Sequence, residues 1–302
     1  MKSIKIGTRN SPLALWQARE VARHLQNLNY TTEIVPVVSS GDKQLDAPLY
    51  QMGITGVFTR DLDQALLDGQ VDLAVHSLKD VPTLLPEGLA LFGYLKRDFP
   101  QDVLVRASQA KNKSLNELKV ATSSLRRRAF WAEKFPNAEF TDIRGNVQTR
   151  LDKLENGIAD ATLFSKAGLE RLNLSIEFED IDFMLSAPGQ GVVTFAGRKA
   201  DTELKEILAD LNHKETQICV EIERAFLSTL EGGCTAPIGA YAEYLGDRIR
   251  FHGKICSLEG RESIEIEESL PGDATELEGR KLAERFLEQG AREIMAKIKP
   301  RL

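Results

Sequence analysis

The feature that most constrains the fold of this chain is an alternation of short apolar runs with amphipathic stretches. Residues 3–7, 32–38 and 71–76 have the composition and length of strands, whereas 11–28 and 57–67 carry apolar residues at helical spacing. The same order returns in the second hundred residues. Strands that alternate with helices predict βαβ units around a mostly parallel sheet, so we expect two α/β units in series.

Two segments interrupt this alternation and divide the chain. Lys96–Asp102 and the Gly- and Pro-rich Ser186–Gly191 have the composition of crossings between units. From residue 214 the pattern changes to a long helix, three strands and a final helix over 274–298, which predicts a separate α+β unit. The expected division is into domain 1 at residues 1–97 and 190–211, domain 2 at 98–189, and domain 3 at 212–302.

Composition argues against several classes of protein. The 302 residues hold 39 Lys and Arg against 45 Asp and Glu, a formal charge of −6, so we expect no nucleic-acid partner. No apolar run approaches the roughly 18 residues that span a bilayer, and the first residues lack the apolar core of a signal peptide. We therefore expect no membrane partner and a cytoplasmic location. The chain contains no GxGxxG, GxxxxGK[ST] or GxSxG motif.

Polar and basic residues cluster where expected strands end and helices begin. These clusters hold, in chain order, Arg9 and Ser11, then Lys79 and Asp80, then Ser124, Arg126 and Arg127, then Arg144, Gly145 and Arg150. In open α/β sheets ligands bind beyond the carboxyl ends of strands, and helix N-termini with arginines favour anions. The clusters predict a cleft for a polyanionic small molecule. For the run Arg126–Arg128 alone, a solvated basic helix face explains the charges equally well.

Two further residues have alternative interpretations. Asp80, at the mouth of a buried strand, can serve as an acid or base or stabilise a cation, but it can also cap the turn before Pro82. Cys234 lies in a glycine-rich loop, where a thiolate can be reached as a nucleophile or attachment point. Cys219 and Cys256 fall in a helix and a strand, so we expect them to be structural. Without a CxxC motif or clustered histidines, we expect no disulfide framework and no metal.

Taken together and in order, these motifs resemble the porphobilinogen deaminase (hydroxymethylbilane synthase) family. Any one of them is weak, but the ordered set extends over nearly the whole chain and is specific. The motifs are GTRNSPLALWQA from Gly7, HSLKDVP from His76, TSSLRR from Thr122, RGNVQTR from Arg144, AGL from Ala167 with Arg171, PGQG from Pro188, and EGGC from Glu231 with PIG from Pro237.

The resemblance implies a fold and a reaction. Two α/β domains like those of type II periplasmic binding proteins would flank the active cleft. A third domain would carry one dipyrromethane cofactor per chain, linked as a thioether to a cysteine that is Cys234 by motif position. Members of the family condense four molecules of the substrate, porphobilinogen, head to tail onto this primer. They release four ammonia, and hydrolysis then frees hydroxymethylbilane.

Matching family positions imply roles for individual residues. Asp80 would be the catalytic carboxylate, which stabilises a cationic azafulvene and orients pyrrole N–H groups. The basic residues would bind the acetate and propionate groups that each pyrrole bears. By this reading Lys79, Ser124, Arg126, Arg127, Arg144 and Gly145 bind the cofactor, and Arg9, Ser11, Arg150, Arg171 and Gln190 bind the substrate.

The chain departs from the family in a loop that we expect to act as a flap. Ser39–Gly56 is polar and contains glycines, and it has Gln51 and Thr55 where many members carry lysines, with Arg60 as the candidate replacement. One alternative to a deaminase is a binding module that clamps an anionic solute, which would not need the third domain. Another is a cysteine hydrolase, for which a histidine partner is lacking. No exposed apolar stripe stands out, so we expect a monomer.

Overall fold

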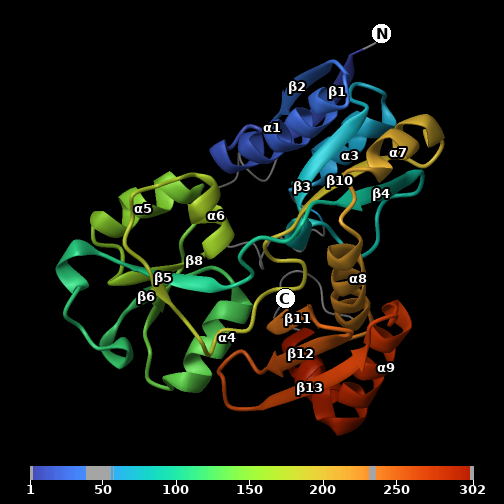
Figure 1. Ribbon diagram of the computed structural model, residues 1–302. Helices are drawn as coiled ribbons and strands as arrows, with labels where there is room; N and C mark the ends of the chain where they lie inside the picture. Colours follow the sequence, from blue (N-terminus) through green and yellow to red (C-terminus); the bar gives the residue numbers. More distant parts are fainter. Residues whose placement is uncertain (1–2, 39–55, 57, 231–235, 300–302) are drawn as a thin grey trace.

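The computed structural model describes residues 3–38, 56, 58–230 and 236–299. Its chain forms three sheet-containing domains, and the long helix near the middle of Figure 1 leads from the first domain to the third. Most of the expected flap lies outside the described residues. Within the described ranges, no helix combines the length and apolar character needed to cross a bilayer.

Domain 1 is a sheet with helices on both faces. Its strand order is β2 (Thr32–Val37), β1 (Ile4–Arg9), β3 (Leu73–Ser77), β10 (Val193–Arg198) and β4 (Leu89–Tyr94). The helices are α1 (Pro12–Asn27), α3 (Arg60–Leu67) and α7 (Thr202–Ala209). α1 and α7 share one apolar core with the sheet, and α3 packs into a separate core against Val71, Ala74 and Ala196.

Domain 2 repeats this plan around a larger apolar core that contains the fully buried Phe130 and Trp131. Its strand order is β7 (Phe140–Thr141), β6 (Val120–Ala121), β8 (Ala161–Ser165), β5 (Asp102–Arg106) and β9 (Glu179–Asp180). The helices are α4 (Leu125–Lys134), α5 (Val147–Glu155) and α6 (Lys166–Arg171), with the short turns η3 (Ser108–Ala110) and η4 (Leu115–Glu117).

The expectation of mostly parallel sheets is confirmed, because four of the five strands in each α/β sheet run in one direction and one strand runs against them. β1 pairs in parallel with β2 and β3, and β6 with β7 and β8, but β10 and β5 run antiparallel to both of their neighbours. β5 follows the first crossing and β10 follows the second, so each strand enters its sheet from the other domain and in the opposite direction. The fold class is confirmed as well, since two α/β domains precede a C-terminal α+β domain.

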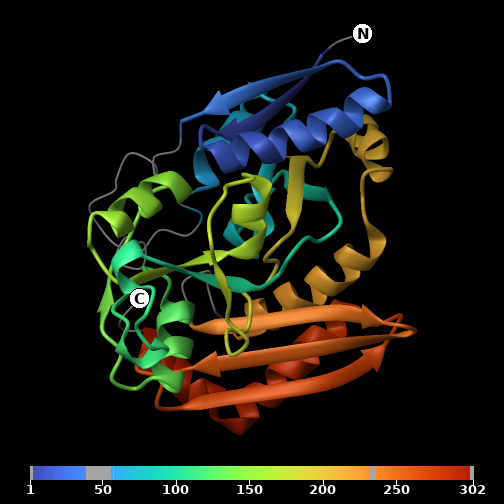
Figure 2. The ribbon, with the colours of Figure 1, turned by 60° about the vertical axis from the view of Figure 1, so that its left-hand side comes forward.

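Domain 3 is a three-stranded antiparallel sheet packed against helices (Figure 2). It contains α8 (Lys214–Thr229), β11 (Ile238–Leu245), β12 (Arg248–Cys256), β13 (Ser263–Pro271), α9 (Glu276–Phe286), the π-helical turn η5 (Leu287–Ala291) and α10 (Arg292–Ile298). The single final helix expected over 274–298 is wrong, because Gly290 has a φ of 110° that breaks it, a conformation open to glycine. Cys219 and Cys256 are buried, as predicted.

Candidate active site

A cavity of about 990 Å³ lies where the three domains meet. Domain 1 contributes the turn between β1 and α1 and the short helix η2 (Leu78–Asp80) that follows β3. Domain 2 contributes the N-terminal ends of α4 and α5. Domain 3 contributes Leu227, Ala236 and Ile238. Parallel strands that end at the same edge of a sheet bring these loops together, as the sequence predicts.

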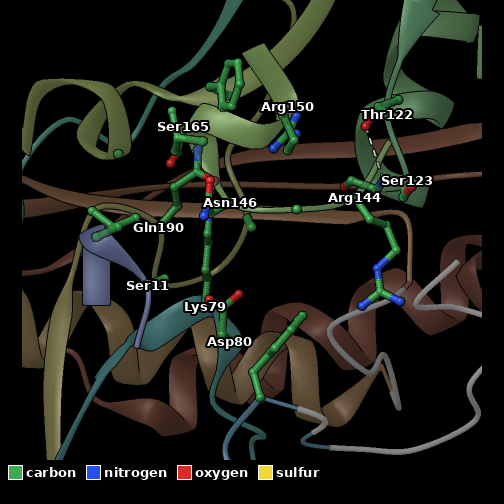
Figure 3. A pocket seen from close by; sticks show the side chains of 18 of the residues that line it. Ser11, Lys79, Asp80, Thr122, Ser123, Arg144, Asn146, Arg150, Ser165 and Gln190 are labelled. Carbon is green, nitrogen blue, oxygen red and sulfur yellow. Dashed lines mark hydrogen bonds between the residues drawn. The ribbon is translucent and has the colours of Figure 1, made fainter. Parts of the chain in front are cut away.

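Residues from nearly all the predicted clusters line this one cavity. Figure 3 shows Lys79 and Asp80 on one side of the space and Arg150 on the opposite side. Two predicted residues are not among those lining it, because Arg171 lies elsewhere and Cys234 falls outside the described residues. The predicted residues that do line it are Arg9, Ser11, Lys79, Asp80, Ser124, Arg126, Arg127, Arg144, Gly145, Arg150 and Gln190.

The turn after β1 brings Arg9 and Ser11 to the cavity. Ser11 is the N-cap of α1, and its hydroxyl accepts a hydrogen bond from the Ala14 N–H at 3.3 Å, as a Ser-Pro pair at a helix start predicts. The buried Thr8 hydroxyl donates to the Ala14 carbonyl at 3.0 Å, which ties the turn to the helix. The Arg9 guanidinium lies 4.2 Å from the centre of the Phe58 ring, a cation–π contact.

The helix η2 presents the Asp80 side chain to the cavity. The turn is closed by the Val81 N–H, which donates to the Leu78 carbonyl at 3.0 Å, and within the described residues the Asp80 carboxylate makes no hydrogen bond to it. The structure therefore does not support a turn cap for Asp80. Nearby, burial and the Arg9 guanidinium lower the pKa of His76 to about 4, so this imidazole is neutral at physiological pH.

Lys79 is a cation held in place by a neutral partner. Its ammonium donates to the Gln190 side-chain oxygen at 3.1 Å, and the Gln190 amide in turn donates to the Asp102 carboxylate at 3.1 Å. Within the described residues, no carboxylate lies within ion-pair distance of Lys79. Burial and the nearby Arg127 lower the pKa of Lys79 to about 8, so it is a mostly protonated group whose charge an incoming anion would stabilise.

The arginine run at the start of α4 is buried, so the alternative of a solvated basic face is wrong. Arg126 and Arg127 are 5% and 8% exposed, and each donates to the fully buried Asp102 carboxylate at 2.6 Å. Burial alone would raise the pKa of Asp102, but the two guanidinium groups hold it well below its usual range. Sequence analysis missed this residue, which it placed in a crossing. The sequence signal that could have identified Asp102 is an acidic residue directly before the apolar run Val103–Val105.

Arg150 has a different environment on the same wall. Its guanidinium donates to the Thr162 hydroxyl at 2.9 Å and the Leu163 carbonyl at 2.7 Å, and it lies 4.2 Å from the centre of the Phe164 ring. Within the described residues no carboxylate pairs with it, and its buried Nε has no hydrogen-bond partner. Burial and the proximity of Arg127 lower the pKa of Arg150 to about 9. Arg150 is thus a charged donor aimed at a polar cavity.

The loop before α5 supplies a second set of anion donors. Gly145 has a φ of 118°, which turns the chain so that Asn146 can cap α5 by accepting from the Thr149 N–H at 3.0 Å. The Arg144 side chain lines the cavity beside this helix N-terminus. The backbone carbonyl of Arg144 accepts a hydrogen bond from the Lys153 ammonium at 3.1 Å. Backbone N–H groups and an arginine therefore converge here, as anion binding requires.

Arg171 joins the two crossings instead of lining the cavity. Its guanidinium lies 2.8 Å from the Asp98 carboxylate, donates to the Gly191 carbonyl at 2.6 Å, and packs over the Trp16 ring at 5.3 Å. This position couples the segments that connect domains 1 and 2. Its role in substrate binding stays a prediction. Arg60 is exposed at the start of α3 and does not line the cavity either.

Comparison with known proteins places these features in a family. Residues 4–206 match the model of the porphobilinogen deaminase, dipyromethane cofactor binding domain, and residues 217–288 match that of the porphobilinogen deaminase C-terminal domain. The porphobilinogen deaminases of Chlorobium limicola and Chlorobium phaeovibrioides are 41% and 40% identical over 310 residues, covering 99% of this chain and 98% of each relative.

Among solved structures, the L-cystine solute receptor of Neisseria gonorrhoeae is similar at 18% identity and a TM-score of 0.39, over 69% of this chain and 84% of that one. The two family models and the near full-length identity to curated relatives cover all three domains and the cavity between them. The chain belongs to the porphobilinogen deaminase family.

Proposed function

We propose that the cavity is the site at which this chain builds hydroxymethylbilane, with Asp80 as the catalytic carboxylate and one dipyrromethane primer attached to Cys234 as a thioether. The family reaction, a transferase reaction, joins four porphobilinogens head to tail, releases four ammonia and frees the product by hydrolysis. The observation that carries the proposal is the meeting in one cavity of Asp80 with two cations that form no ion pair with a described carboxylate, Lys79 and Arg150. Family membership excludes the solute-clamping and cysteine-hydrolase alternatives.

The residues of the cavity fit a dipyrromethane in chemistry. Each of its two pyrroles bears an acetate and a propionate, so the group carries several carboxylates and apolar rings. Lys79 and the buried Nε of Arg150 are cationic donors in need of acceptors, and Phe164 and Leu227 line the same space with apolar surface. When bound, the group supplies the pyrrole carbon to which the first substrate is joined. Lys79, Ser124, Arg126, Arg127, Arg144 and Gly145 would hold it.

The chain on both sides of Cys234 supports its role as the attachment point. Leu227 and Ala236 both line the cavity, and Ala236 follows Cys234 by two residues in the chain. The other two cysteines are unsuited to attachment. Burial raises the pKa of Cys219 and of Cys256 to about 12, so neither thiol ionises readily.

Asp80 is suited to stabilise positive charge on the substrate. Its carboxylate lines the cavity without a hydrogen bond from the described residues, and it therefore enters the reaction as an uncommitted anion. Departure of ammonia from the substrate leaves an electron-poor carbon, and a fixed negative charge beside that carbon lowers the barrier. Arg9, Ser11, Arg150, Arg171 and Gln190 are the groups proposed to bind the incoming carboxylates. A monomer working in the cytoplasm remains our expectation from the sequence.

Intact-mass measurement combined with turnover tests the proposal. The purified parent should carry a two-pyrrole adduct and give a colour with Ehrlich's reagent in acid, and Cys234→Ser should lose both adduct and turnover. Asp80→Asn should keep the fold and lose about 10²–10³ in rate, since it removes a preorganised charge. An adduct that survives Cys234→Ser, or an Asp80→Asn enzyme that turns over at the parental rate, would contradict the corresponding assignment.

A further inference from the structure

The turn that carries Asp80 comprises η2 (Leu78–Asp80) with Val81 and Pro82, and is called the catalytic turn below. A residue of domain 3 holds it in place. Arg224, on α8, donates from Nη1 to the Val81 carbonyl at 2.9 Å and from Nη2 to the Pro82 carbonyl at 2.7 Å. Val81 and Pro82 directly follow Asp80 in the chain. One planar guanidinium therefore grips two consecutive peptide units next to the catalytic carboxylate, and this two-point contact fixes direction as well as distance.

The charge of Arg224 is committed to this contact. Within the described residues no carboxylate pairs with Arg224, and burial lowers its pKa. Arg224 is half-buried, and a charged group partly removed from water without a counter-ion costs free energy, which the hydrogen bonds to the two carbonyls offset. The arrangement therefore points to a requirement for the position of the turn, beyond a requirement for packing.

A second contact from α8 holds the other end of the same turn. Leu78, which begins η2, is fully buried in a small apolar cluster with Val220 of α8, Tyr94 and Val192. Val220 and Arg224 are four residues apart and so lie on one face of the helix. The turn is consequently held at Leu78 by packing and just beyond Asp80 by hydrogen bonds, both from one rigid helix.

The residue before Arg224 has a separate task. Glu223 is fully buried, pairs with Arg97 at 2.8 Å, and accepts from the backbone N–H groups of Gly189 and Ala242 at 2.8 and 2.7 Å. Glu223 thus joins both crossings to β11, whereas the hydrogen bonds of the Arg224 guanidinium within the described residues go to Val81 and Pro82. Because the two tasks are divided between neighbours, the turn contact can be removed without breaking the buried ion pair that joins the domains.

We propose that Arg224 is a positioning residue for Asp80. It fixes the catalytic turn against α8, the helix that leads into the segment bearing Cys234, and so keeps the carboxylate aligned with the growing chain on the primer. The proposal rests on the catalytic role of Asp80 given above. Its consequence is that loss of Arg224 acts on the rate of chemistry through Asp80, with little effect on substrate affinity or on cofactor attachment.

The test compares Arg224→Met with Arg224→Lys and with a matched control, Arg280→Met. Arg280 is an exposed arginine of α9, also in domain 3, and among the described residues its ion-pair partner is Glu276, one helical turn away. Arg224→Met should lower kcat about 10- to 100-fold, as displacements of about 1 Å do, with KM within about twofold and the two-pyrrole mass retained. Arg224→Lys, which keeps one charged donor, should recover part of the loss. Arg280→Met should match the parent.

A double-mutant cycle separates positioning from a general structural defect. If Arg224 acts through Asp80, Arg224→Met should add little to the loss already caused by Asp80→Asn, because no carboxylate remains to be positioned. Multiplied losses would overturn the inference, as would a parental kcat in Arg224→Met or a deficit that disappears when thermal stability is restored by a lower assay temperature. If Arg224→Met does not fold, Arg224→Lys carries the same cycle. A parental rate in Asp80→Asn alone would instead refute the proposed role of Asp80.

Discussion

Two groups of arginines on the domain 2 wall of the cavity share a residue type and a location but differ in electrostatic state. Arg126 and Arg127, at the start of α4, both bind the buried Asp102 carboxylate at 2.6 Å. Arg150, on α5, is held by the Thr162 hydroxyl, the Leu163 carbonyl and the Phe164 ring, with no carboxylate partner among the described residues. The one Asp102 carboxylate offsets half of the charge of the first group, whereas Arg150 keeps its full charge for a ligand.

The difference indicates that Arg126 and Arg127 join parts of the structure through Asp102, whereas Arg150 is available to bind a ligand. Asp102 begins β5 directly after the first crossing, and it also accepts from Gln190, which lies in the second crossing. The Asp102 cluster therefore ties α4 to both connections between domains 1 and 2, and Gln190 extends it to Lys79. Arg150 has no such structural connection to the crossings. We expect variants of the two groups to fail in different ways, the first in stability and the second in affinity.

The largest expected effect comes from Asp102→Asn. This change leaves two buried guanidinium groups without a counter-ion, so it should lower the free energy of unfolding by about 3–5 kcal/mol. Chemical denaturation measures the loss. The control is Asp180→Asn, which breaks an ion pair with Lys166 at 2.9 Å whose carboxylate is 56% exposed, and which should cost at most about 1 kcal/mol. Equal small losses in both variants would mean that Asp102 is not a structural joint.

Local features of the site could be predicted from the sequence, whereas contacts between residues distant in the chain could not. The Ser-Pro start of α1, the polar turns after β1 and β3, and the arginine clusters are local signals, and nearly all the residues that they indicated line one cavity. The pairing of Asp102 with Arg126 and Arg127 spans more than twenty residues and depends on a strand that runs against its neighbours. No local pattern encodes such a contact. The same reason explains why the antiparallel strands β5 and β10 were not predicted.

The contact of Arg224 with the catalytic turn was beyond sequence reasoning for a similar cause. Arg224 lies within a helix of mixed polarity, 143 residues after Val81, and nothing in its neighbourhood distinguishes it from an exposed arginine. The break at Gly290 was also missed, because glycine is tolerated inside helices and only the observed φ reveals the kink. The loops that line the cavity were thus predictable from local signals, whereas partners distant in the chain and the kink at Gly290 were not.

Arg150→Leu gives the next effect in size and tests the other side of the comparison. Loss of one charge-assisted contact should cost about 1.5–3 kcal/mol in binding, a rise in KM of roughly 10- to 150-fold, and partly extended chains should accumulate on the primer. Stability should stay at the parental level or rise, since an uncompensated buried charge is removed. Arg126→Leu is the matched control, and it should instead destabilise the fold and leave apoenzyme. Equal losses of stability in the two variants would contradict the distinction between a structural role for Arg126 and a ligand-binding role for Arg150.

The smallest effect is a pH dependence that belongs to Lys79. Burial and Arg127 lower its pKa to about 8, so in the free enzyme half of its charge is lost at that pH. Carboxylates of the primer bind the protonated form, so the primer should be held less firmly and kcat/KM should fall as pH rises through 8, with the charged fraction dropping about tenfold for each further pH unit. Below pH 7 the group is fully charged, so the profile should not depend on it there.

Substitution of Lys79 identifies the source of that alkaline limb. Lys79→Met should lower kcat/KM at neutral pH and remove the limb near pH 8, whereas Lys79→Arg should retain a charge to higher pH and shift the limb upward. Lys111→Met is the control, because Lys111 is exposed, pairs with Glu177 and does not line the cavity, so its profile should match the parent. A limb near pH 8 that persists in Lys79→Met would assign the titration to another group. Lys79 of domain 1 would then play no part in holding the carboxylates of the growing chain, and Arg150 of domain 2 would bind them without it.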